Sequence, residues 1–314
     1  MPMPPTVPTE SKPSARAREL VMGAYDLHVH SGPDVMKRRI MDLDLARRFA
    51  EVGLAGYVIK SHYVATSARA TLVNAAVPGV RVLGSVVLNA LSGGVTPLAV
   101  EIAAREGARL VWMPTVDSEN ERRLRGGATD QAKLPFWAKL QDEMREMGME
   151  APPVAVVDES GAVLPETRQV LERIAHHGMV LATGHLSRDE IFAVVDAALE
   201  EGVKQIIVTH PDFPTQNLSM EDQRMLAEMG AYLERCFTTA HTGKISWEEM
   251  ITRIRASGVA SNVLSTDLGQ PANPPVEDGL ALMADKLLAA GFSEEEVHAM
   301  AVRNTVKLAG GSPA

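Results

Sequence analysis

One unit recurs along the chain: an amphipathic stretch, a glycine and then a short apolar run. In the first clear example, Leu45, Phe49 and Val52 have helical spacing and precede Gly53 and the apolar run 57–59. Such spacing predicts a surface helix that packs on a buried strand. Eight apolar runs of this kind begin near Ala24, Ala55, Arg81, Ala108, Gly178, Lys204, Gly230 and Ala260.

The alternation of these runs with helical segments indicates the fold class. Helices between consecutive strands are typical of parallel βα units. Eight such units in about 250 residues match an α/β (β/α)8 barrel, a TIM barrel, and an open doubly wound sheet is the alternative. In a barrel, the functional groups lie at the C-terminal ends of the strands.

The stretch 117–164 interrupts this rhythm and is interpreted as an insertion after the fourth strand. It contains Arg122, Arg123, Arg125 and Gly126, then a helical pattern over 136–147 and a hairpin pattern over 154–164. We expect the insertion to cover or shape the active-site pocket, with a peripheral decoration or an oligomer contact as the alternatives. Residues 1–20 are rich in Pro, Ser, Thr and charge, which predicts a disordered tail before a barrel over 21–314.

Composition excludes several function classes. The net charge of −9 argues against a general nucleic-acid partner. The single cysteine, Cys236, excludes a disulfide framework and a cysteine-rich zinc site, and fits a cytoplasmic location. No apolar run reaches the ~20 residues that span a bilayer, so we expect no membrane partner. The expected partners are a small-molecule substrate and further copies of the chain in a homo-oligomer.

Imidazole and carboxylate groups follow the predicted strands. His28 and His30 are two residues apart on the first strand, so their side chains should point to one side. His185 and His210 follow the fifth and sixth strands, and Asp267 follows the eighth. The eighth strand of a closed barrel lies beside the first, which brings Asp267 close to the histidine pair. This donor set suits zinc, with manganese, iron or cobalt as alternatives.

The order of these motifs resembles the amidohydrolase superfamily of metal-dependent hydrolases, over nearly all of the chain from Tyr25 to Gly310. In that superfamily an HxH motif ends strand one, single histidines end strands five and six, and an aspartate ends strand eight. The resemblance implies that the metal ligands are His28, His30, His185, His210 and Asp267. It points to an uncharacterised branch, since nothing around the site matches a particular enzyme.

The chain departs from the family pattern at the end of strand four. Two-metal members carry a carbamylated lysine or a glutamate there, but this strand ends in Met113, Pro114 and Thr115, and Asp117 lies too far along. One metal is therefore favoured. The second strand ends with Lys60 and His62, which should face one side and bind an anionic substrate or supply a second metal's ligands.

Two further residues end the seventh strand, Glu234 and Arg235. They are candidates for substrate binding, and a structural ion pair is the alternative. Among the other motifs, Ser187 caps a helix and is no nucleophile, and the loop or helix positions of the remaining histidines do not favour ligation.

These roles predict the chemistry. A metal-activated water would attack an amide, cyclic amide, lactone or ester bond in a small, anionic substrate. Asp267 would accept the water's proton and pass it to the leaving group, and His210 would stabilise the developing oxyanion. A metal-dependent decarboxylase and a phosphoesterase are the alternatives on the same barrel. A binding module without catalysis is the alternative from a different class of protein.

Overall fold

Eight parallel strands pair in the order β1 to β8, as the apolar runs predict. The computed structural model describes residues 12–125 and 136–311. The strands are β1 (Tyr25–Val29), β2 (Gly56–Ile59), β3 (Arg81–Val87), β4 (Ala108–Trp112), β5 (Val180–Ala182), β6 (Ile206–Val208), β7 (Tyr232–Cys236) and β8 (Asn262–Ser265).

The chain beyond β8 closes the barrel on β1. The Asp267 amide donates to the His28 carbonyl oxygen, and the His30 amide donates to the Leu268 carbonyl oxygen, both at 2.8 Å. Val29 and Leu268 form a parallel bridge. The predicted (β/α)8 barrel is therefore confirmed, and the open sheet is not formed.

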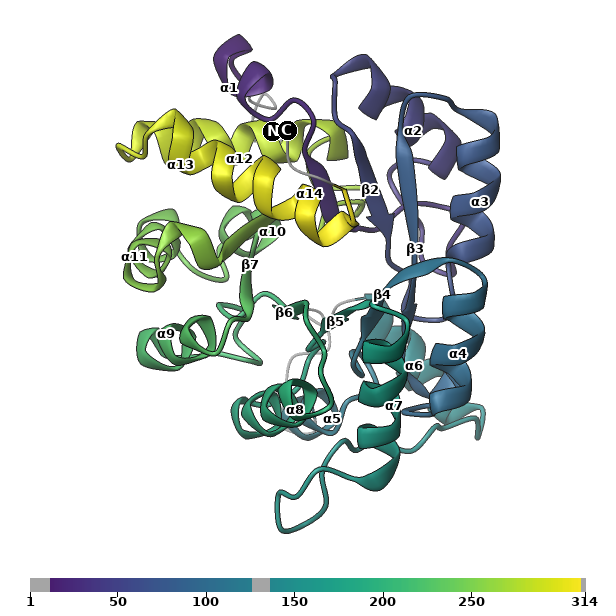
Figure 1. Ribbon diagram of the computed structural model, residues 1–314. Coiled ribbons are helices and arrows are strands. Elements are labelled where there is room, and N and C mark those ends of the chain that lie inside the picture. The colour runs from purple at the N-terminus through teal and green to yellow at the C-terminus, as the bar shows by residue number, and fades with distance from the viewer. Residues whose placement is uncertain (1–11, 126–135, 312–314) are drawn as a thin grey trace, which may run out of the picture.

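Helices surround the strands in a ring (Figure 1). Before the insertion they are α1 (Ala15–Leu20), α2 (Asp42–Glu51), α3 (Ser67–Ala76) and α4 (Pro97–Arg105); within it they are α5 (Glu119–Arg125) and α6 (Phe136–Glu146). The later ones are α7 (Pro165–His176), α8 (Arg188–Glu200), α9 (Met220–Glu228), α10 (Phe237–His241), α11 (Trp247–Ser257), α12 (Val276–Ala289), α13 (Glu294–His298) and α14 (Asn304–Ala309). Short turns of other helix types are η1 (Ala90–Ser92), η3 (Val259–Ser261) and η4 (Ala299–Arg303). No helix of the described part is long and apolar enough to cross a bilayer.

The predicted helix starts hold in detail. Thr96 caps α4, with Pro97 in its first turn, and Ser187 and Glu190 form the capping box of α8. Inside the barrel, a cluster that includes Leu27, Val58, Leu110 and Trp112 is fully buried. This apolar plug supports the residues at the C-terminal ends of the strands.

The prediction of a disordered tail over 1–20 is wrong for its last part. Ala15–Leu20 forms α1, capped by Ser14, whose hydroxyl donates to Asp285 in α12 at 2.6 Å. Six residues form a stable helix here because they pack on α12, and local composition does not reveal that partner. Residues 1–11 of the predicted tail lie outside the described residues.

The insertion contains the predicted helix and hairpin, and also the helix α5, which the sequence pattern did not predict. Helices α5 and α6 are followed by an antiparallel bridge between Val157 and Val163, which is the predicted hairpin in a short form. Gly126 and Gly127 lie outside the described residues.

Candidate metal centre

Three predicted ligands meet at the C-terminal mouth of the barrel. One carboxylate oxygen of Asp267 lies 3.2 Å from His28 Nε2 and 3.1 Å from His30 Nε2. Both histidines are buried, whereas the Asp267 side chain keeps 18% of its surface exposed. The three side chains therefore converge on one point that opens towards solvent at the aspartate.

The two single histidines join this group from neighbouring strands. The His185 and His210 rings lie 4.9 Å apart between centroids, and His210 stacks on His28 at 6.0 Å. Both residues are buried. The structure thus brings together all five residues that the motifs single out.

Carboxylates hold two of the histidines at the ring nitrogen that faces away from the centre. Glu234 oxygens lie 3.1 and 3.2 Å from His28 Nδ1, and Glu121 Oε1 lies 2.9 Å from His185 Nδ1. A carboxylate accepts a hydrogen bond from Nδ1–H, so the proton of the neutral imidazole is on Nδ1 and Nε2 keeps its lone pair. This pairing is typical of histidines that bind metals, because it sets the tautomer and the ring orientation.

Neutral oxygens hold the other two histidines in the same way. The Lys60 carbonyl oxygen lies 3.1 Å from His30 Nδ1, and Gln216 Oε1 lies 3.1 Å from His210 Nδ1. All four rings therefore have an oxygen at Nδ1, which leaves Nε2 as the free donor atom. Among the described residues, His28, His30 and Asp267 each offer one ligand atom within 4.8 Å of the other two, which fits a divalent metal, and the His185 and His210 rings lie beside this group.

The protonation states of the candidate ligands also suit metal binding. Burial lowers the pKa of His28, His30 and His210 well below the usual value, so these imidazoles are neutral at physiological pH. Burial raises the pKa of Asp267, but the neighbouring His28, Lys60 and His210 side chains lower it, and the pKa ends below its usual value. Asp267 is therefore a carboxylate. Neutral imidazole and ionised carboxylate are the forms that ligate metals.

The backbone is forced into unusual conformations at this site. His210 and Asp267 have positive φ values of 25° and 52°, which non-glycine residues rarely adopt. Gly184 and Gly269 let the neighbouring segments approach closely, because a Cβ atom would lie 2.3 Å from the Met113 carbonyl oxygen and 1.6 Å from that of His30, respectively. These glycines allow His185 and Asp267 to reach the centre.

Lys60 reaches the centre from the end of β2, as predicted. Its Nζ lies 3.0 Å from His28 Nε2 and 4.3 Å from the centre of the Trp112 ring, and the residue is 1% exposed. Burial lowers the pKa of this amine. His62 is also placed as predicted, with its ring 5.1 Å from that of His30 and its Nδ1 2.9 Å from Thr115 Oγ1.

The two β7 candidates point to opposite sides, and neither is an open substrate contact. Glu234 faces into the barrel, fully buried, with its carboxylate against His28; burial raises its pKa to about 7. Arg235 points outwards, where it pairs with Asp212 at 2.6 Å and hydrogen-bonds to Asn262 at 2.6 Å. The prediction that Arg235 lines the pocket is wrong, because adjacent residues of a strand alternate between its two faces. The alternative, a structural ion pair, holds.

Sequence reasoning missed Glu121, which lies in α5 of the insertion. Ser118 and Asn120, just before it, both donate to the His185 carbonyl oxygen, at 3.1 and 3.2 Å. The start of the insertion therefore shapes the centre, which supports the first interpretation of this segment. No local motif marks Glu121, since its partner His185 is 64 positions away.

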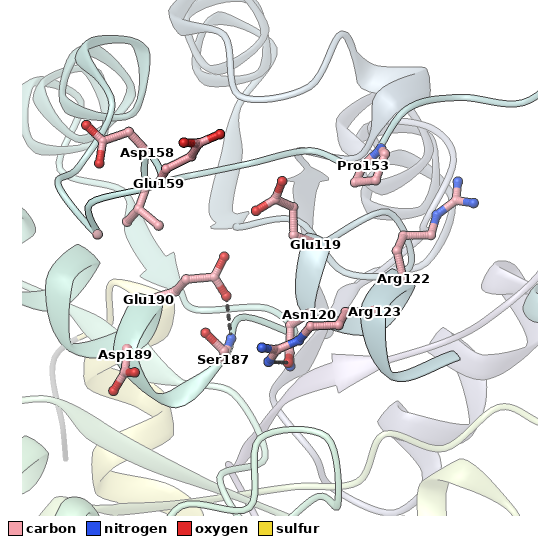
Figure 2. A pocket seen from close by; sticks show the side chains of 12 residues that line it. Glu119, Asn120, Arg122, Arg123, Pro153, Asp158, Glu159, Ser187, Asp189 and Glu190 are labelled. Atoms are coloured by element: carbon pink, nitrogen blue, oxygen red, sulfur yellow. Dashed lines mark hydrogen bonds between the residues drawn. The ribbon is translucent and has the colours of Figure 1, made fainter. Parts of the chain in front are cut away.

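The end of strand four supplies no ligand, in agreement with the departure seen in the motifs. Asp117 is engaged by Arg122 Nη2 at 3.0 Å and by Gln141 Nε2 at 2.8 Å, away from the histidines. A separate hollow of about 750 Å³ lies between the insertion and the start of α8 (Figure 2), where Ser187 and Glu190 form their capping hydrogen bond. None of the residues that line this hollow is a histidine of the centre.

Several solved structures share this fold. The probable dipeptidase PvdM from Pseudomonas aeruginosa matches 94% of this chain and 97% of its own, with 12% identity and a TM-score of 0.62. An amidohydrolase from the same organism matches 93% and 97%, with 11% identity and a TM-score of 0.58. The phosphotriesterase homology protein from Escherichia coli, complexed with phosphate, matches 91% and 98%, with 13% identity and a TM-score of 0.55. These likenesses show the fold.

In sequence, the chain matches a family of unknown function, DUF6282, over residues 23–234. The match covers most of the barrel, and the protein belongs to this family. No curated protein matches the chain.

Proposed function

We propose that this protein is a metal-dependent hydrolase of the amidohydrolase type. It would cleave an amide, cyclic amide, lactone or ester bond in a small, anionic substrate. The observation that carries the proposal is the convergence of His28, His30 and Asp267 within hydrogen-bond distance, with the outer nitrogen of each imidazole already held by an oxygen. The single cysteine supports the further proposal of a cytoplasmic location.

The metal would be held by His28, His30 and Asp267, with His185 and His210 completing the donor set. Zinc suits these ligands best, and manganese, iron or cobalt are alternatives. Such an ion supplies a Lewis acid and lowers the pKa of water towards 7.

The remaining chemistry belongs to side chains around the centre. Asp267 accepts a proton from the attacking water and returns it to the leaving group. Thr238 donates to the other carboxylate oxygen of Asp267 at 3.0 Å, which orients the first oxygen towards the histidines. His210, whose ring stacks on that of His28 at 6.0 Å, would ligate the metal or stabilise a developing oxyanion.

Lys60 and His62 would contact the substrate from the end of β2. A buried ammonium needs anionic partners. Asp267 and Glu234 raise the pKa of the Lys60 amine against the effect of burial, and in our proposal an anionic substrate is a further partner. The alternative is a carbamate on Lys60 Nζ that ligates a second metal.

A phosphoesterase is the second candidate, because the histidine cluster is larger than one metal requires. The His62 ring lies 5.1 Å from that of His30 and 6.3 Å from that of His185, so His62 is a fifth imidazole at the mouth. An extended cluster of this kind favours a site with two or three metals.

Elemental analysis of the purified protein tests the metal centre. The wild-type protein is expected to hold about one zinc equivalent, and a His30→Ala variant to lose it while its circular dichroism spectrum is unchanged. His241→Ala is the matched control, since His241 is exposed on α10 and stacks only on Phe237. Equal metal content in wild type and His30→Ala would contradict the proposal.

Activity assays then separate the reaction classes. The zinc-loaded protein is tested on N-acyl amino acids, lactones and phosphate esters, with and without a chelator. Hydrolysis of an acyl substrate that stops on chelation supports the leading proposal. Phosphate release supports the second candidate, and release of carbon dioxide without consumption of water indicates a decarboxylase.

A further inference from the structure

The hydroxyl of Tyr63 is buried without a hydrogen-bond partner among the described residues. The residue is 8% exposed, and its hydroxyl oxygen lies within 3.5 Å of no suitable partner there. A buried polar group without a partner destabilises the folded state, so proteins rarely keep one. Phenylalanine would fill the same space at no such cost. We therefore expect the Tyr63 hydroxyl to hydrogen-bond to a ligand that is not part of the chain.

Tyr63 lies next to the metal centre. It directly follows His62, and the two rings meet edge to face at 6.3 Å. His62 in turn stacks on His30. Burial raises the pKa of Tyr63 to about 12, and the nearby Asp34 adds to this effect. The hydroxyl is thus a neutral hydrogen-bond donor at physiological pH.

Arg38 lies on the same side of the centre, in the loop after β1. Its Nε and Nη2 both donate to Asp34 Oδ2, at 3.0 and 2.9 Å, and its side chain is 5% exposed. Its Nη1 hydrogen-bonds to no described residue. Asp34 therefore holds one edge of the guanidinium in place and leaves the other edge unused.

The contact between Arg38 and His30 leaves a further donor unused. Arg38 Nη2 lies 3.3 Å from His30 Nδ1, but the Lys60 carbonyl oxygen lies 3.1 Å from the same nitrogen. A nitrogen that donates to a carbonyl cannot accept from a guanidinium. When His30 Nε2 ligates a metal, Nδ1 carries the proton. Nδ1 then donates to the Lys60 carbonyl oxygen and cannot accept from Arg38 Nη2.

We infer that Arg38 and Tyr63 form a subsite that binds a carboxylate group of the substrate beside the metal centre. This inference rests on the proposed function, in which the bound molecule is a substrate that the metal centre hydrolyses. A carboxylate has two coplanar oxygens, of which one can accept from the guanidinium and the other from the phenol. The substrate class would then be acyl compounds with a free carboxylate, such as N-acyl amino acids.

The acidic neighbours of Tyr63 favour a singly charged group over a phosphate. After the effect of burial, Asp34 raises the pKa of Tyr63, Arg38 lowers it and Asp117 raises it, so two carboxylates and one guanidinium lie near the hydroxyl. Arg38 is already paired with Asp34. A dianion would meet more repulsion here than a carboxylate does.

Calorimetric titration with two matched probes tests the subsite. N-acetylglycine carries the carboxylate, and N-acetylglycinamide is its neutral counterpart. We expect the wild-type protein to bind the first at least 10-fold more tightly. Tyr63→Phe should reduce this preference roughly 10-fold, the effect of one hydrogen bond to a charged group, while its melting temperature is unchanged or higher. Arg38→Lys keeps the positive charge beside Asp34 but loses the planar guanidinium, which can donate two parallel hydrogen bonds. It should reduce the preference for N-acetylglycine by a similar factor.

Tyr232→Phe is the matched control. The Tyr232 hydroxyl accepts from Lys307 Nζ at 3.0 Å, at an exposed contact with α14. This variant should keep the full preference for N-acetylglycine.

The titrations are run on protein with and without zinc, so that the two proposals fail separately. Equal binding of both probes by the wild type, or an unchanged preference in Tyr63→Phe, overturns the subsite even if zinc is bound. Tighter binding of inorganic phosphate that depends on Tyr63 overturns the assignment to a carboxylate. Absence of any bound divalent metal overturns the proposed function, whereas a preference that depends on Tyr63 in the metal-free protein still supports the subsite.

Discussion

Two adjacent residues of β7 should separate metal affinity from fold stability. Glu234 faces the barrel interior and contacts His28, whereas Arg235 faces the surrounding helices. We predict that Glu234→Gln weakens metal binding with little effect on stability. Arg235→Met should do the reverse. Because the two positions are neighbours on one strand, each variant is the control for the other.

The expected loss for Glu234→Gln follows from its contacts with His28. Both carboxylate oxygens lie within 3.2 Å of Nδ1, so the charge that orients the ring and raises its basicity is lost in the amide. Removal of such a partner lowers metal affinity by roughly 10- to 100-fold. That factor is about 1.4–2.8 kcal/mol of binding free energy.

The expected loss for Arg235→Met follows from a buried network. Arg235 is fully buried and also hydrogen-bonds to Gln223 at 2.7 Å and to Ser257 at 3.1 Å. Removal of one partner from a buried ion pair costs about 3–5 kcal/mol, because the other charge is left uncompensated. Asp212 keeps Arg253 at 3.2 Å, so we expect the lower end of that range.

Urea unfolding of the metal-free proteins, followed by circular dichroism, measures stability. Zinc titration against a competing chelator measures affinity in the same preparations. Wild-type zinc affinity in Glu234→Gln would refute the assignment of His28 as a ligand held by Glu234. A loss of zinc affinity in folded Arg235→Met would refute the placement of Arg235 outside the centre.

Three further predictions concern the centre itself. His28→Ala and His185→Ala should each lower the metal content sharply without unfolding the barrel, and wild-type stoichiometry in both would exclude them as ligands. Asp267→Asn should keep the fold and lose roughly 10²-fold or more in turnover, since an amide cannot accept a proton; near-normal steady-state turnover would exclude that role. Lys60→Met should weaken binding of an anionic substrate by about 1.5–3 kcal/mol in a titration and leave the metal content intact. If it halves the metal stoichiometry instead, Lys60 ligates a second metal as a carbamate.

The barrel and the five candidate ligands could be predicted from the sequence because both depend on periodic or local signals. Each strand is a short apolar run, and His28, His30, His185, His210 and Asp267 each lie near the end of such a run or within three residues after it. In a parallel barrel, residues that follow strands must gather at one end. Once the fold class is known, the position of a residue at the end of a strand predicts that it lies near the other residues at that end of the barrel.

Tertiary structure alone decided which residues support those ligands and which face away. Glu121 meets His185 across 64 positions, and it does so only because the insertion folds back over β5. Arg235 ends a strand like the true candidates, yet strand alternation turns it outwards to Asp212. Helix α1 packs on α12 and α13, with Ser14 bonded to Asp285 and Arg16 paired with Glu294. Such pairings depend on packing between segments far apart in the chain, for which hydrophobic periodicity carries no signal.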